Sequence, residues 1–137
     1  MDTRRGLQVR EATLIDSESI AILCAQVAEE KKGTEIVVLH VGKVVPITDY
    51  FVLVTARNRR QIDAIAEEMR LRLKALEVRP QRQEGRGTGR WELIDFGAVV
   101  VHLFDEPTRR YYDLDGLWAD CESLCYRDST GAEASNA

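Results

Sequence analysis

Hydrophobic residues recur along the chain at two spacings, one typical of helices and one of strands. The first helical pattern covers 17–32, and Asp16 or Ser17 supplies a side chain that can cap it. Its predicted buried positions are Ile20, Leu23, Cys24, Val27 and Ala28. Gly33 follows, so we expect it at the left-handed position that often ends a helix.

Two strands are predicted next. Residues 35–41 are rich in β-branched side chains and lie between Gly33 and Gly42. Residues 50–55 are almost wholly apolar, which is typical of an interior strand covered on both faces.

The clearest helix is predicted over 58–76. The Asn58 side chain can accept from the backbone N–H of Gln61, and Gln61 can reach back, as in a capping box. Glu68 and Arg72 stand four apart on the exposed side. The predicted buried stripe is Ile62, Ile65, Ala66, Met69, Leu73 and Leu76.

The second half of the chain begins with three further predicted strands. Residues 78–84 form a candidate edge strand, since Pro80 is tolerated only there. The glycine-rich segment 85–89 connects it to strands 90–96 and 99–104, which form a hairpin around Gly97-Ala98.

Helical segments are then expected over 108–113 and 114–125. The predicted fold is α/β, a mixed sheet of about five strands with helices packed on it. We expect one domain over residues 1–126, with 1–12 loosely ordered and 127–137 a disordered tail.

Composition narrows the class of protein. No run of apolar residues is long enough for a membrane span, and Met1 to Arg5 lack a following apolar segment, so no secretory signal is expected. Three cysteines are too few for a disulfide scaffold and fit a cytoplasmic protein. Cys121 and Cys125 would share a helical face, where two half-buried thiols are a simpler interpretation than a metal site.

Charge is distributed unevenly around a net value of −4. Residues 57–90 hold ten basic and five acidic side chains, and residues 92–122 hold two basic and eight acidic ones. The pattern allows an acidic surface for a basic partner beside a basic flank, although solvated faces alone would also explain it.

The residue patterns that could indicate a catalytic site are each incomplete in this sequence. His40 and His102 each lie inside an apolar strand, and segment 85–89 lacks the lysine and the following helix of a phosphate-binding loop. Asp113 and Asp115 resemble a magnesium-binding pair, but no glycine-serine turn precedes them. We therefore expect no enzyme activity, no cofactor and no metal.

Aromatic residues gather late in the chain, interleaved with acids. Such residues often anchor protein interfaces, but they could equally close the core at the end of the sheet. They are Trp91, Phe104, Tyr111, Tyr112 and Trp118.

Six segments, in order, resemble the ribosomal silencing factor (Iojap, RsfS) family over about residues 14 to 120. Asn58 replaces the usual serine, an equivalent cap, and Ala98 replaces a usual aspartate in the hairpin turn. The segments are 46–55 (PITDYFVLVT), 58–61 (NRRQ), 84–85 (EG), 91–97 (WELIDFG), 99–104 (VVVHLF) and 112–118 (YDLDGLW).

The resemblance implies a nucleotidyltransferase-like fold without catalytic residues, homodimeric when free. It implies binding to large-subunit ribosomal protein number fourteen, with steric block of small-subunit joining and so repression of translation. Trp118 and Tyr112 are expected as anchors, and Asp95 and Asp115 as acceptors for basic side chains. The full expected partner-binding set is Trp91, Asp95, His102, Phe104, Tyr112, Leu114, Asp115, Leu117 and Trp118.

Two alternatives remain open at this level. One is an active nucleotidyltransferase. The other is a large-subunit assembly factor that contacts ribosomal RNA through the arginine-rich segment 57–90.

Overall fold

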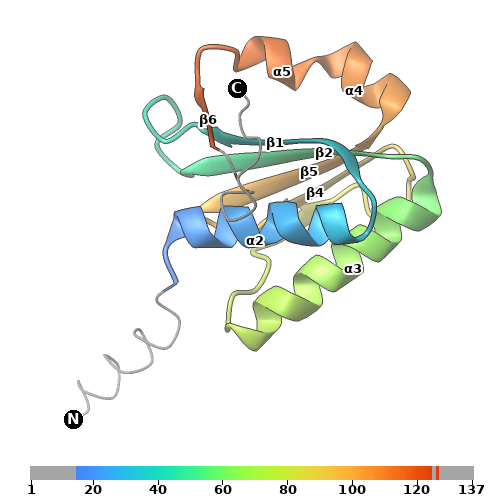
Figure 1. Cartoon of the computed structure of the whole chain (residues 1–137), viewed down its shortest axis with the longest axis horizontal. Coiled ribbons are helices and arrows are strands. Elements are labelled where there is room, and N and C mark those ends of the chain that lie inside the picture. Colours follow the sequence, from blue (N-terminus) through green and yellow to red (C-terminus); the bar gives the residue numbers. More distant parts are fainter. Residues whose placement is uncertain (1–14, 125, 127–137) are drawn as a thin grey trace.

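The computed structural model describes residues 15–124 and residue 126. Six strands form one sheet in the order β3-β4-β5-β2-β1-β6, with α2 and α3 on one face and α4 and α5 on the other (Figure 1). The expectations for residues 1–12 and 127–137 lie outside the described residues. The elements are α2 (Ser17–Glu30), β1 (Thr34–His40), β2 (Tyr50–Ala56), α3 (Arg59–Ala75), β3 (Arg82–Glu84), β4 (Trp91–Asp95), β5 (Val99–Asp105), α4 (Glu106–Tyr112), α5 (Leu114–Leu117) and β6 (Glu122–Leu124).

The predicted mixed sheet is confirmed. Strand β2 pairs with β5 in parallel, and every other pairing in the described sheet is antiparallel. Helix α3 and the strands β3 and β4 supply the long connection that a parallel pair requires.

Helices α2 and α3 cover one face of the sheet and bury most of the core. Side chains alternate along β5, so Val99, Val101 and Leu103 point toward these helices. The expected buried stripes are largely confirmed, with Leu23 and Leu76 only partly buried at the margin. The other face of the sheet carries a second, smaller cluster around Leu39, Val41, Leu53 and Phe104.

The start of α3 shows how the two covering helices are joined. Asn58 accepts from the backbone N–H of Gln61 at 2.9 Å, which confirms the predicted cap. The Gln61 side chain reaches back to the backbone N–H of Arg57 at 2.6 Å and also donates to the Lys31 carbonyl at 2.9 Å. One buried glutamine therefore links the start of α3 to the end of α2.

The end of α2 differs from the prediction. Lys32, with φ of 69°, takes the left-handed position, and the Gly33 N–H donates to the Ala28 carbonyl at 2.8 Å. A Cβ at position 33 would lie 2.7 Å from Cγ1 of Val54. Glycine is required there because α2 turns directly against β2, not because of its φ angle.

The segment 114–125 was expected to be helical, and this was wrong. Helix α5 covers only Leu114–Leu117, and Glu122–Leu124 form strand β6 against β1, with Val38 opposite Leu124. The sheet therefore has six strands instead of about five. Cys121 is half-buried and precedes this strand instead of lying in a helix, and Cys125 lies outside the described residues.

The candidate edge strand is confirmed at the edge of the sheet but is shorter than predicted. Only Arg82–Glu84 pair with β4, and Pro80 lies in the preceding loop. The hairpin around Gly97-Ala98 is confirmed, with the Phe96 N–H donating to the Val99 carbonyl at 2.9 Å.

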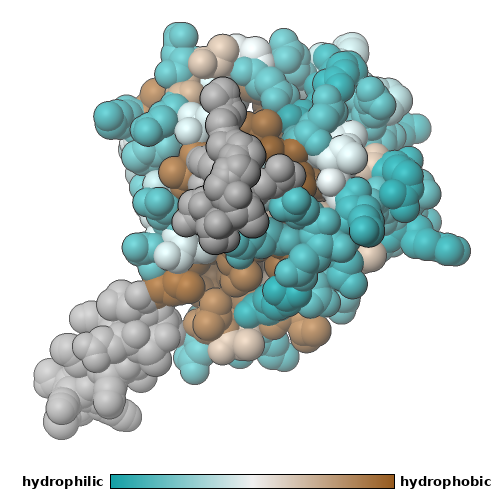
Figure 2. Space-filling model, viewed as in Figure 1, coloured by the Kyte–Doolittle hydropathy of each residue, from teal (hydrophilic) through white to brown (hydrophobic). Residues whose placement is uncertain are grey.

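The surface is mostly hydrophilic on the side seen in Figure 1. Figure 2 shows hydrophobic atoms gathered between α2 and the C-terminal half of α3, the helix that carries the exposed Leu71. Within residues 15–124 and 126, no helix is long and apolar enough to cross a membrane.

Candidate docking face

The sheet face opposite α2 and α3 is only partly covered, because α4 and α5 are short. Cross-strand pairing arranges its side chains in three rows: Phe51, Val100 and Asp95; then Leu53, His102 and Leu93; then Thr55, Phe104 and Trp91. Leu93 and Val100 are half-buried and belong to neither core cluster. We call this surface, together with Tyr112, Leu114, Leu117 and Trp118 from the α4–α5 segment that packs on it, the docking face.

Aromatic rings run across the docking face in continuous contact. Tyr112 lies 4.7 Å from Trp91, measured between ring centroids. Phe51 links the far side, 5.0 Å from His102 and 5.3 Å from Trp118, with both contacts edge-to-face. Aromatic pairs at these separations contribute interaction energy beyond that of their buried area. The contacts between successive rings therefore help to hold the rings of this face in place.

His102 is the polar centre of this ring chain. The Trp91 indole N–H donates to its Nδ1 at 3.1 Å, and Phe104 stacks on its ring at 5.9 Å. Burial lowers the pKa of His102 to about 4, so the imidazole is neutral at physiological pH. In this structure it therefore acts through packing and hydrogen bonding.

Helices α4 and α5 are held on the sheet by Arg109, whose side chain is only 3% exposed. It donates to the Glu35 carbonyl at 2.7 Å and to the Thr55 hydroxyl at 3.0 Å. It also donates two hydrogen bonds to the Asp115 carboxylate, at 3.0 and 2.8 Å. Desolvation opposes ionisation of Asp115, but the bonds and charge of Arg109 outweigh it, so the Asp115 pKa is lowered.

The expected acceptors therefore differ in availability. Both carboxylate oxygens of Asp115 already bind Arg109, so Asp115 positions α5. Asp95 uses one oxygen for the backbone N–H of Gly97, at 2.8 Å, and lies at the other end of β4 from Trp91. Asp120 is exposed and forms no ion pair within the described part of the chain.

The expected anchors also differ in exposure. Leu117 is 69% exposed and Tyr112 is 51% exposed, whereas Phe104 is buried and belongs to the second core cluster. Leu114 and Trp118 are half-buried against the same cluster. The structure thus brings all nine expected residues to one side of the sheet, some as exposed contacts and some as their support.

Two contributors were missed from the sequence. Phe51 was counted as part of a wholly interior strand, although period-two alternation places it on the opposite face from Val52. Arg109 carried no sequence signal, because its partners Glu35 and Thr55 are more than fifty residues away.

The suspected magnesium pair does not converge. Asp113 caps α5 by accepting from the backbone N–H of Gly116 at 3.1 Å, while Asp115 faces Arg109. Among residues 15–124 and 126, no group of three or more histidine, cysteine, aspartate or glutamate side chains could hold a metal ion.

The chain is similar to a described protein family, to relatives of known sequence and to solved structures. Residues 15–137 match the family model described as "Ribosomal silencing factor during starvation". The chain is 31% identical over 110 residues to the ribosomal silencing factor RsfS of Halalkalibacterium halodurans, covering 80% of this chain and 94% of that protein. A crystal structure of a protein from Chromobacterium violaceum superimposes with a TM-score of 0.74 at 31% identity, covering 77% and 88% of the two chains.

A more distant relative is named for the ribosome as well. The mouse protein called mitochondrial assembly of ribosomal large subunit protein 1 is 30% identical over 92 residues. That alignment covers 65% of this chain and 40% of the mouse protein.

Proposed function

Because the chain belongs to the ribosomal silencing factor family, we propose that it docks onto the large ribosomal subunit and represses translation. The partner is large-subunit ribosomal protein number fourteen, and the bound domain blocks joining of the small subunit by occupying its place. The names of the relatives, silencing factor and large-subunit assembly protein, support a large-subunit partner.

The observation that carries the proposal is the half-covered aromatic sheet face. Exposed Leu117 and Tyr112 stand beside half-buried Phe51 and Trp118, and Leu93 and Val100 extend the apolar area. Interfaces of this kind have a desolvated aromatic centre and a polar rim. Contact at the centre would make Trp118 and Tyr112 the anchors of binding.

Charge at the rim fits a basic partner. Asp95 lies on the docking face in the row of Phe51 and Val100, and Asp113 and Asp120 are exposed in the segment that carries Leu114, Leu117 and Trp118. Ribosomal proteins are commonly basic, so opposite charge would speed their encounter with this face. Asp115 would contribute indirectly, by holding α5 in place through Arg109.

The experiment is sedimentation of the protein with purified large and small subunits, followed by a subunit-joining assay. We expect co-sedimentation with the large subunit and loss of joining. Leu117→Asp should weaken both by about tenfold or more, because it places a charge in the apolar contact. Leu71→Asp is the matched control, since Leu71 is 59% exposed on α3, on the other side of the sheet.

Direct binding to purified ribosomal protein number fourteen, measured by calorimetry, tests the named partner. Equal effects of Leu117→Asp and Leu71→Asp would contradict the docking face. Binding to the large subunit without binding to that protein would contradict the partner and leave the face in place.

A further inference from the structure

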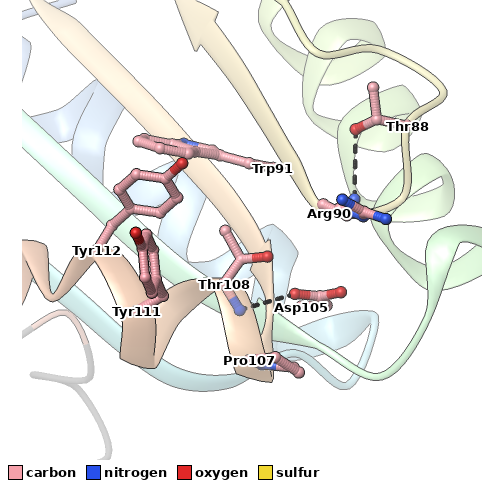
Figure 3. Close-up of a pocket in the computed structure, with 8 residues that line it drawn as sticks. All are labelled: Thr88, Arg90, Trp91, Asp105, Pro107, Thr108, Tyr111 and Tyr112. Carbon is pink, nitrogen blue, oxygen red and sulfur yellow. Dashed lines mark hydrogen bonds between the residues drawn. The ribbon is translucent and has the colours of Figure 1, made fainter.

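A concave surface adjoins the docking face at Trp91 and Tyr112. It is an open groove of ≈ 970 Å³ between the glycine-rich loop 85–90 and helix α4 (Figure 3). The groove sits outside the carboxyl end of β5, which is parallel to β2. In open α/β sheets, ligands commonly bind outside the carboxyl ends of parallel strands. Its lining residues are Thr88, Arg90, Trp91, Asp105, Pro107, Thr108, Tyr111 and Tyr112.

The groove is lined by an exposed aromatic ring that takes no part in either core cluster. Tyr111 is 79% exposed and belongs to neither core cluster. Its ring is perpendicular to that of Tyr112, 4.9 Å away, and Tyr112 in turn rests on Trp91 (Figure 3). Flat rings held at right angles and open to solvent are suitable platforms for stacking a nucleobase.

Two arginines of the glycine-rich loop have no counter-ion among the described residues. Arg90 lines the groove and Arg86 stands on the same loop; both are exposed, and neither forms a salt bridge with any residue in 15–124 or 126. By contrast, Arg70, Arg72 and Arg110 are all paired with carboxylates. Unpaired arginines beside a groove attract an anion, and phosphate accepts hydrogen bonds well from arginine.

The loop that carries these arginines is fixed against the body of the domain. Gly85 has φ of +77°, and a Cβ there would lie 1.9 Å from the Trp91 carbonyl oxygen. The Thr88 hydroxyl donates to the Gly85 carbonyl at 2.8 Å. The Arg90 N–H donates back to the Thr88 hydroxyl at 3.3 Å, as drawn in Figure 3. The backbone from which Arg86 and Arg90 project is therefore held in place before any ligand arrives.

Asp105 is the single acidic residue in the lining. One of its oxygens accepts from the backbone N–H of Thr108 at 3.0 Å, so the carboxylate caps α4. The Asp105 carboxylate is thus engaged at the start of α4, whereas the guanidinium of Arg90, the basic residue of the lining, forms no ion pair with the described residues.

We propose that this groove binds an unpaired nucleotide of RNA, with the base stacked on Tyr111 and a flanking phosphate held by Arg90. The inference deepens the proposed function and rests on it in one respect: at the ribosome, the RNA beside the docking face would be ribosomal RNA. An exposed flat ring next to unpaired arginines suits a single strand, whose bases are free to stack, better than a duplex.

The test is fluorescence anisotropy of a labelled single-stranded oligoribonucleotide titrated with the full chain, compared with the same sequence as a duplex. Tyr111→Ala should weaken single-strand binding by about tenfold. Tyr111→Phe should retain it, because the ring is kept. Thermal unfolding of Tyr111→Ala should match that of the unaltered protein, since the ring is exposed.

Charge is tested with a matched pair of variants. Arg90→Gln should weaken binding and reduce the slope of log affinity against log salt by about 0.7, the value for one phosphate contact on a single strand. Arg79→Gln is the control, because Arg79 is also exposed without an ion pair in the described part of the chain but follows the far end of α3. It should leave both the affinity and the slope unchanged.

The proposal is overturned if Tyr111→Ala binds the oligoribonucleotide as well as the unaltered protein does. It is also overturned if Arg79→Gln and Arg90→Gln have equal effects, which would indicate non-specific attraction. Binding of an acidic peptide that depends on Tyr111, with no RNA binding, would assign the groove to a protein instead. None of these assays contains ribosomal protein number fourteen, so their failure is distinguishable from failure of the docking proposal.

Discussion

The indole N–H of Trp91 donates to Nδ1 of His102, 3.1 Å away, and this contact fixes the tautomer of the imidazole. Because Nδ1 accepts, the proton is carried by Nε2. That nitrogen is buried and has no hydrogen-bond partner among the described residues. A second proton on the ring would remove the acceptor of Trp91 and place a charge within the aromatic centre of the docking face.

Stability is therefore expected to depend on pH through His102. Its pKa is lowered to about 4 in the folded protein, against an ordinary value of about 6.5 in the unfolded chain. Between these values the unfolded chain binds more protons, so the free energy of unfolding falls as pH falls from about 6.5 to about 4. The loss at pH 5 relative to pH 7.5 should be about 2 kcal/mol.

Urea unfolding at several pH values measures this loss. In His102→Phe the slope between pH 7 and pH 5 should largely disappear, because the ring volume is kept and the titrating group is removed. A variant with the same slope as the unaltered protein would show that another group is responsible.

A second prediction concerns the ion pair between Arg109 and Asp115, which fixes the position of α5. Asp115→Ala removes two hydrogen bonds from a buried guanidinium and should lower the free energy of unfolding by about 1.5 kcal/mol. Since the Asp115 pKa is lowered, its contribution is present above about pH 4 and is lost as pH falls through the lowered value. Asp120→Ala, at an exposed carboxylate without an ion pair in residues 15–124 and 126, should change stability by less than about 0.5 kcal/mol. Equal effects in chemical denaturation would contradict this role.

A third prediction concerns the ion pair between Arg70 and Glu92, on the sheet face opposite the docking face. The Arg70 guanidinium lies 3.1 Å from the Glu92 carboxylate, whose side chain is 1% exposed. Arg70→Leu leaves that carboxylate buried without its counter-ion and should cost about 3 kcal/mol. Adding Glu92→Leu should recover most of this loss, because no charge then remains to be desolvated. A double variant as unstable as the single one, in the same unfolding assay, would refute the explanation.

The fourth prediction separates interface from core at Trp118. The ring is half-buried and meets Phe51 edge-to-face at 5.3 Å. Trp118→Ala should weaken binding to the large subunit by about 2 kcal/mol, while the domain still unfolds cooperatively. Calorimetry for binding and thermal unfolding for folding give the two values. If the variant is unfolded and its folded fraction binds normally, Trp118 belongs to the core and the proposed anchor is wrong.

Local patterns were sufficient for the elements that depend on local contacts. The cap of α3 by Asn58 and the ion pair of Glu68 with Arg72, at 2.8 Å, involve residues three or four apart. The apolar run at 50–55 also identified the interior strand. In each case the residues that decide the structure are near neighbours in sequence.

Features that depend on distant residues were not predicted. Strand β6 forms because β1 offers an unpaired edge more than eighty residues earlier, which no pattern within 118–125 reveals. The roles of Arg109 and Glu92 depend in the same way on Glu35, Thr55 and Arg70. For the docking face, the sequence singled out residues that the fold brings to one side of the sheet, but it could not separate exposed Leu117 from buried Phe104.

The position of β6 also affects the order in which the chain can fold as it is synthesised. Strands β1 and β2 leave the ribosome early, but within the described part of the chain the outer edge of β1 is paired by Glu122–Leu124 alone. Until that segment emerges, the residues of β1 that face this edge have free backbone donors and acceptors, which are able to pair with another nascent chain. Completion of the sheet is thus one of the last steps in the synthesis of the domain, and a chain that stops short of residue 122 would retain an open, aggregation-prone edge.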